Sequence, residues 1–257
     1  MFSPAGGLIY HFKAFRQWFR RRIGREDHWH RTRELASGHL REFVRDARAD
    51  VLVLVGPSGG YLLSSDTLER MKLRRLIVVE PDFLAHLIFR WRMRRRKVET
   101  LFLKTKRLLP FFDPDGDALD LFLQSLKASE RGSVAVVFWG VLGQVKLLEQ
   151  SWRQSENEGR RRLLKALDGV SFASLHDGLS WRAHEAEGFS ITPYTGNRAD
   201  VLARELAAIE EREPKAIVID HDMGWLEEEL VIEAFPWVLS SRQIHSLHWV
   251  RRLNTVP

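Results

Sequence analysis

Short runs of apolar residues, separated by segments with helical spacing, most constrain what this chain can fold into. Three of these runs are Val51–Val55, Leu76–Val79 and Val134–Phe138, and a fourth is Ala216–Ile219. Apolar runs of this length are typical of strands buried on both faces of a parallel sheet. Because helical patterns stand between them, the chain predicts βαβ units with right-handed crossovers. The predicted fold class is therefore α/β: a Rossmann-like, mostly parallel twisted sheet with helices on both faces.

The first 49 residues differ in character from the rest of the chain. Apolar residues recur at three- and four-residue steps over 9–23, with arginines between them, and a second helix is predicted over 30–48. No strand-like run precedes residue 51. We therefore predict a basic helical extension at 1–49, followed by a Rossmann-like domain at 50–257.

Composition narrows the class of protein. The 257 residues include no Cys, which excludes a disulfide scaffold, a thiolate metal site and a Cys nucleophile. No apolar run approaches the ~20 residues of a membrane span, and the N-terminus lacks the features of a signal peptide, so we expect a cytoplasmic protein. The 40 Lys and Arg against 34 Asp and Glu give a net charge of +6, which favours anionic partners without identifying one.

The strongest functional pattern is the glycine-rich turn that follows the first apolar run. Gly56, Gly59 and Gly60 allow a close approach of the backbone to a ligand, and the N-terminus of the next helix favours negative charge. Glu80 ends the second run, where a carboxylate can accept hydrogen bonds from both hydroxyls of a ribose. Since ligands bind beyond the carboxyl ends of strands in open α/β sheets, the pattern predicts a cofactor site here.

At these segments the chain resembles the class I S-adenosylmethionine-dependent methyltransferases. The resemblance rests on VLVLVGPSGGYLL at 51–63 and LIVVEPD at 76–82, and is supported by VAVVFWGVLGQ at 134–144. The late run AIVID at 216–220, with a hairpin-like tail after it, fits a sheet closed by an antiparallel last strand. The resemblance implies S-adenosylmethionine as cofactor and methyl transfer to an unknown substrate as the reaction.

The resemblance also implies a role for each matching residue. The methionine and ribose side of the cofactor would be lined by Gly56, Ser58, Gly59 and Gly60, the ribose hydroxyls would be bound by Glu80, and Asp82 would lie near the adenine.

Three departures from the family pattern make the chain a divergent example. Val53 or Leu54 stands where the family has an acidic residue, and its Gly-x-Gly-x-Gly pattern is replaced by Gly-Pro-Ser-Gly-Gly. The sequence at 138–140, Phe-Trp-Gly, stands in place of the Asn/Asp-Pro-Pro-aromatic motif of amino-group methyltransferases. A nicotinamide cofactor is the alternative, because Gly56 and Glu80 are close to the ~20-residue spacing of a dinucleotide fingerprint. The loop, however, is not Gly-x-Gly-x-x-Gly.

Two groups of His and Asp residues follow the later strand-like runs. His176 and Asp177 come after a short strand predicted over 172–175, and Asp-His-Asp stands at 220–222. A His beside a carboxylate can act as a general base at neutral pH, so we predict that His176 and Asp177 are catalytic. Alternatively, such residues cap helices or tie loops together. The same groups can hold a divalent metal, but their spacing matches no known site, and we predict none. His245-x-x-His248 is a weaker pattern, because positions three apart on a strand face opposite sides.

A basic run is the third pattern. Arg90, Arg94, Arg95 and Arg96 are interleaved with Trp91, which is typical of surfaces that bind phosphates and stack on bases. The second candidate function is therefore a non-catalytic Rossmann-like protein whose basic face binds nucleic acid or another polyanion. Two alternatives are an N-terminal helix that lies on anionic lipid, and a solvated surface whose aromatic residues belong to the core.

Overall fold

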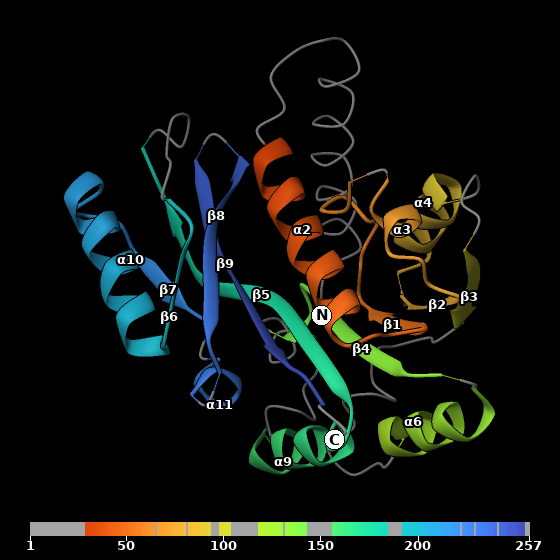
Figure 1. Cartoon of the computed structure of the whole chain (residues 1–257). Helices are drawn as coiled ribbons and strands as arrows, with labels where there is room; N and C mark the ends of the chain where they lie inside the picture. Colours follow the sequence, from red (N-terminus) through yellow and green to blue (C-terminus); the bar gives the residue numbers. More distant parts are fainter. Residues whose placement is uncertain are drawn as a thin grey trace.

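The computed structural model describes residues 29–64, 66–80, 82–93, 98–103, 118–130, 132–142, 156–184, 192–221, 223–228, 230–240 and 242–254 (Figure 1). The helices in this part of the chain are α2 (His30–Asp46), α3 (Thr67–Arg70), α4 (Phe83–Met93), α6 (Ala118–Ser129), α9 (Glu156–Ala166), α10 (Arg198–Arg212) and α11 (Gly224–Glu227). The strands are β1 (Val51–Val55), β2 (Arg75–Val79), β3 (Glu99–Leu103), β4 (Val134–Trp139), β5 (Ser171–Arg182), β6 (Tyr194–Gly196), β7 (Val218–Asp220), β8 (Ile232–Ser240) and β9 (Gln243–Arg252).

The described strands form one mixed sheet in the order β3-β2-β1-β4-β5-β9-β8-β6, with β7 pairing to β5 off this path. All pairs from β3 to β5 are parallel. In register, Val53 of β1 lies opposite Ile77 of β2 and Val136 of β4, so the three apolar runs are adjacent and parallel as predicted. The strand order reverses between β1 and β4, which is where an open α/β sheet binds its ligands.

The C-terminal strands close the sheet in the opposite sense. β9 is antiparallel to both β5 and β8, so β8 returns to the direction of β5. The last strand of the chain, β9, thus lies antiparallel beside β5, at the end of the parallel part of the sheet. This confirms the Rossmann-like sheet, closed by an antiparallel last strand, that the methyltransferase resemblance predicts.

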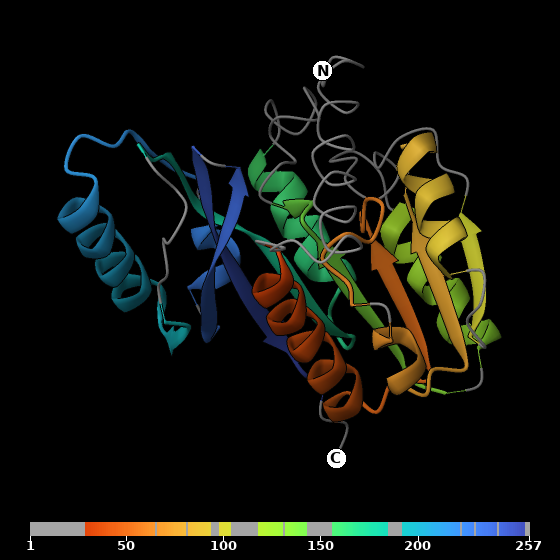
Figure 2. The same cartoon turned by 90° about the horizontal axis from the view of Figure 1, so that it is seen from above.

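Alternate residues of a strand point to opposite faces of the sheet, and in the buried strands the residues on both faces are apolar. Helices therefore cover both faces. Leu52 and Leu54 pack toward α2, α3 and α4 on one face, and Val51, Val53 and Val55 pack toward α6 and α9 on the other. Figure 1 shows the sheet between these two layers, and Figure 2 shows α2 lying along the sheet from the side of the first layer.

Helix α2 shares the core of the sheet. Leu40 and Phe43 of α2 are fully buried in the same apolar cluster as Leu52 of β1 and Trp249 of β9. The boundary predicted at residue 49 therefore separates two elements with a common core. The helix predicted over 9–23 lies outside the described residues.

Two expectations about the later strands are wrong. The strand after α9 was expected over 172–175, but β5 continues to Arg182 because β9 pairs along its whole length. The run at 216–219 was expected to be a buried strand, but β7 is a short strand antiparallel to β5. Ile217 and Ile219 are exposed, so this apolar run is at the surface.

Candidate functional site

The loop after β1 has a conformation that repeats at alternate residues. Gly56, Ser58 and Gly60 all have positive φ, at +68°, +53° and +68°. This is the spacing of a Gly-x-Gly-x-Gly loop, with Ser58 in the middle position. Left-handed backbone costs an L-residue about 1–2 kcal/mol, so other contacts must hold Ser58 in place. The backbone is therefore left-handed at the three alternate positions of a Gly-x-Gly-x-Gly pattern, although the middle glycine is absent.

Glu80 holds this loop. The backbone N–H of Ser58 donates to Glu80 Oε2 at 2.7 Å, and the N–H of Asp82 donates to Glu80 Oε1 at 3.0 Å. Glu80 is 7% exposed. Asp82 Oδ1 accepts from the N–H groups of Leu84 and Ala85, so Asp82 caps the first turn of α4. The sequence-predicted residues Ser58, Glu80 and Asp82 are thus brought together in one group at the carboxyl ends of β1 and β2.

Arg92 of α4 supports the same loop from the other side. Its Nη1 donates to the carbonyls of Gly59 and Gly60, at 3.0 and 2.6 Å, and its Nη2 donates to the carbonyl of Leu63 at 3.1 Å. The guanidinium lies over the ring of Tyr61. The role of Arg92 was not predicted from the sequence, because the basic segment that contains it was interpreted only as a surface for anions.

The glycines of the loop let neighbouring side chains pack closely. A Cβ at Gly56 would lie less than 3.0 Å from Val141, which follows β4, and a Cβ at Gly60 would do the same with Phe89 of α4. The loops after β1 and β4 therefore meet, on either side of the point where the strand order reverses. Gly56 and Ser58 are half-buried, whereas Gly59 and Gly60 are buried.

His176 and Asp177 lie within β5. The pairing of β5 with β4 ends at Leu175, so the two residues lie just beyond it. Neighbouring strand residues face opposite sides of a sheet, and the two side chains belong to separate clusters. His176 is fully buried on the α11 face, and Asp177 is buried on the other.

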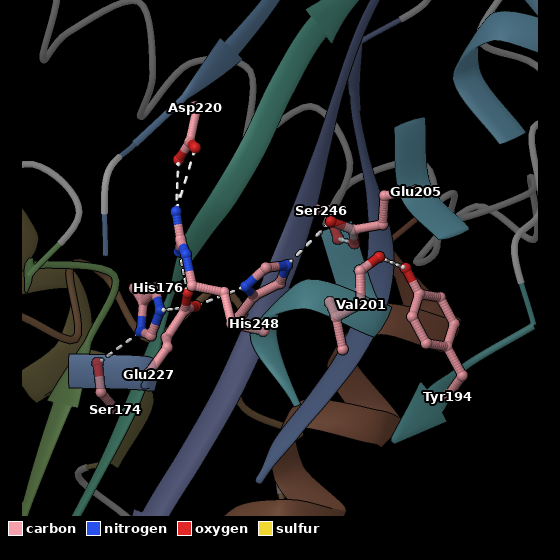
Figure 3. Close-up of polar contacts among 10 residues, drawn as sticks. Ser174, His176, Tyr194, Val201, Glu205, Asp220, Glu227, Ser246 and His248 are labelled. Carbon is pink, nitrogen blue, oxygen red and sulfur yellow. Dashed lines mark hydrogen bonds and ion pairs between the residues drawn. The ribbon is translucent and has the colours of Figure 1, made fainter. Parts of the chain in front are cut away.

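The first cluster joins β5, β9 and α11 (Figure 3). Glu227 Oε1 accepts hydrogen bonds from His176 Nε2 at 2.9 Å and from His248 Nδ1 at 2.6 Å. The other oxygen of Glu227 accepts from Arg198, and His248 Nε2 is 3.1 Å from Glu205 Oε2. His176, Glu227 and His248 are each fully buried.

The electrostatics of this cluster separate its two imidazoles. Burial lowers the pKa of His176 below its ordinary value, in spite of the hydrogen bond to Glu227. Burial also acts to lower the pKa of His248, but hydrogen bonds to Glu205 and Glu227 outweigh it and raise that pKa to about 9. Burial disfavours ionisation of Glu227, yet its bonds with the two imidazoles keep its pKa lowered. Without a metal, His248 therefore carries the proton and His176 is neutral near pH 7.

The second cluster lies on the opposite face and includes Asp177. His245 Nδ1 is 3.1 Å from Asp177 Oδ1, and the rings of His245 and His221 are stacked with centroids 6.5 Å apart. His221 Nε2 is 3.0 Å from Ser180 Oγ and is only half-buried. A half-buried imidazole beside a carboxylate–imidazole pair can accept or relay a proton.

The structure divides the Asp-His-Asp group expected at 220–222. Asp220 pairs with Arg198 at 3.1 Å, next to the first cluster, whereas His221 belongs to the second. Asp222 lies outside the described residues. His245 and His248 do face opposite sides of β9, as the spacing predicts, and each joins a different cluster. Their partners were missed because the pairing of β9 with β5 is not encoded in local spacing.

Only part of the predicted basic run lies in the described segments. Arg90 is exposed on α4, and Arg94, Arg95 and Arg96 lie outside the described residues. None of the helices that the structure describes is long and apolar enough to cross a membrane.

Comparisons with known proteins give matches of structure only. No family model matches the chain, and no curated protein matches it in sequence. Among solved structures, an O-methyltransferase from Bacillus cereus with bound SAH is 14% identical, with a TM-score of 0.38 and coverage of 85% of this chain and 81% of that one.

Two further structures match at a similar level. The methyltransferase domain of bacterial CtHen1 is 11% identical, with a TM-score of 0.39 and coverage of 83% and 96%. An S-adenosylmethionine-dependent methyltransferase from Clostridium acetobutylicum is 10% identical, with a TM-score of 0.35 and coverage of 85% and 74%. The fold of this chain is established by its own strand order.

Proposed function

We propose that this chain is a divergent S-adenosylmethionine-dependent methyltransferase that binds its cofactor over the loop at 56–60. The observation that carries the proposal is the bond from the N–H of left-handed Ser58 to Glu80, at the point where the strand order reverses. It places a carboxylate at the end of β2 against a loop of Gly-x-Gly-x-Gly shape.

The donor and acceptor groups of this site fit the ribose part of the cofactor. A carboxylate offers about four acceptor positions, so bonds from the N–H groups of Ser58 and Asp82 are compatible with bonds from ribose hydroxyls to Glu80. Gly56 and Ser58 are the half-buried part of the loop, on which the methionine end would lie. When bound, the cofactor supplies a methyl group on a positively charged sulfur.

We place the methyl acceptor beyond the carboxyl end of β4, beside the part of β5 that continues past β4. Because His176 is fully buried, we assign proton transfer to the cluster of Asp177, His245 and His221 instead. In this assignment His221, the half-buried member, takes the proton of the acceptor, and the pair of Asp177 and His245 orients it. Positioning two reactants supplies much of the acceleration in a direct displacement, and no covalent enzyme intermediate is needed.

A non-catalytic binding protein is the second candidate. Val53 and Leu54 are fully buried in the core where the family has an acidic residue, which favours this reading. Its basic surface would include Arg90, with Arg94, Arg95 and Arg96 following in the sequence. Binding to nucleic acid that weakens steeply with salt, by about 0.7–0.9 in log–log slope for each phosphate contacted, would support it.

Titration calorimetry with S-adenosylmethionine and its demethylated product separates the two candidates. We expect one site per chain, weakened by about 1.5–3 kcal/mol in Glu80→Gln because a charged hydrogen bond is lost. Glu42→Gln, on the exposed side of α2, is the matched control and should bind as wild type. Ser58→Gly keeps the backbone N–H that donates to Glu80 and gives the loop the Gly-x-Gly-x-Gly pattern, so it should bind the cofactor as wild type does. Absence of heat with both ligands would refute the cofactor site.

A further inference from the structure

The buried cluster on the α11 face brings three potential metal ligands together. His176 and His248 are directly opposite each other in the β5–β9 register, and Glu227 reaches between them from α11 (Figure 3). Their facing atoms, His176 Nε2, His248 Nδ1 and Glu227 Oε1, all lie within 4.8 Å of one another. We propose that this cluster is a binding site for one divalent cation of the zinc type.

The distances suit such a cation. Two ligands bound to zinc at about 2.0–2.1 Å in a tetrahedral arrangement lie roughly 3.3 Å apart. The Glu227 oxygen is 2.9 Å from the His176 nitrogen and 2.6 Å from the His248 nitrogen, so shifts of about half an ångström would admit the ion. Two imidazoles and one carboxylate also form a donor set that zinc sites use.

Outer partners give an independent indication. A histidine that binds a metal usually has its other ring nitrogen bonded to a carboxylate or another polar group, which fixes the ring and its tautomer. Here His176 Nδ1 is 2.9 Å from Ser174 Oγ, and His248 Nε2 is 3.1 Å from Glu205 Oε2. The second oxygen of Glu227 is bonded by Arg198. All three ligands are therefore supported from behind, and their remaining atoms point at one place.

The charges of the cluster also leave a place for a cation. Glu205 and Glu227 are both buried; Arg198 donates to Glu227, and Ser246 Oγ donates to Glu205. Burying a carboxylate without compensation is strongly unfavourable. A divalent cation between the two imidazoles and Glu227 would place positive charge beside both carboxylates. The ion would join α11 to β5 and β9.

The site differs from the one proposed for methyl transfer. It uses neither Glu80 nor the loop at 56–60, and its three ligands are fully buried on the face opposite Asp177. Its test is therefore independent of cofactor binding. The nearest competitor within the described residues is the trio of Asp177, His221 and His245, whose ligand atoms also lie within 4.8 Å of one another.

The test uses the full chain, unfolded in chelator and refolded with or without Zn²⁺ or Co²⁺. We expect one metal ion per chain by elemental analysis after dialysis, a visible Co²⁺ spectrum of nitrogen and oxygen ligation, and a raised unfolding midpoint. His248→Gln should abolish all three, whereas His221→Gln, in the competing trio, should leave them unchanged.

A milder variant keeps the test decisive if His248→Gln does not fold. Ser174→Ala removes only the partner of His176 Nδ1, so the chain should still fold, and its metal affinity should weaken by about 10–100-fold. Failure to retain either metal, or retention that is lost in His221→Gln but not in Ser174→Ala, would overturn the proposal. The cluster would then be a network of ion pairs and hydrogen bonds only.

Discussion

Gly178 is a position at which a single added methyl group should be strongly destabilising. It is the extra residue of a bulge in β5, between Asp177 and Leu179, where the register with β9 shifts. A Cβ built there would lie less than 3.0 Å from three ring atoms of His248. That ring is fully buried and bonded on both sides, so it has no room to retreat.

The magnitude follows from what His248 would lose. Displacing the ring breaks its hydrogen bonds to Glu205 and Glu227, and bonds to charged groups contribute about 1.5–3 kcal/mol each. We therefore expect Gly178→Ala to lower the free energy of unfolding by about 3–5 kcal/mol, the range for breaking a buried charge pair. This is opposite in sign to the usual gain of about 0.4–1 kcal/mol for Gly→Ala at a compatible backbone position.

Urea unfolding, followed by circular dichroism in the presence of chelator, measures the effect. Gly38→Ala is the control, because Gly38 lies in α2 and a Cβ there has only Arg41 within 4.0 Å. It should stabilise the chain by about 0.5–1 kcal/mol. In a His248→Ala background the ring is absent, and Gly178→Ala should cost much less than in wild type. A Gly178→Ala protein as stable as wild type, or equal costs in both backgrounds, would refute the reasoning.

Three further substitutions test other parts of the structure. Ser58→Gly should raise the free energy of unfolding by about 0.5–1 kcal/mol, since glycine adopts positive φ without strain, and urea unfolding measures it. Asn197→Ala should lower it by about 1 kcal/mol, because Asn197 Oδ1 accepts from the N–H of Asp200 at the start of α10. His39, whose Nδ1 is 3.1 Å from Glu233 Oε2, lowers the pKa of Glu233. The stabilising contribution of Glu233 is therefore present above the carboxyl's ordinary value of 4.5 and is lost as the pH falls through the lower folded-state pKa. Glu233→Gln should therefore flatten the acid side of a plot of unfolding midpoint against pH.

The sequence by itself determined the parallel half of the sheet and the group around Glu80. Val51–Val55, Leu76–Val79 and Val134–Phe138 are apolar at every position, so each requires cover on both faces, and only neighbouring strands and helices provide it. Gly56 and Glu80 are close in space because they directly follow two consecutive strands that pair in parallel. This arrangement can be predicted from one stretch of sequence, because the crossover of each βαβ unit is almost always right-handed.

Only the tertiary structure decided what His176 and His248 do. They are far apart in the sequence, and they become neighbours because β9 is inserted antiparallel against β5 in one particular register. A shift of that register by one residue would turn His248 to the other face of the sheet. The exposure of Ile217 and Ile219 could not be predicted from the sequence either, because an apolar run at the edge of a sheet has the same sequence pattern as one in its core. Pairing over long range depends on how distant segments pack, which the periodicity of one segment does not record.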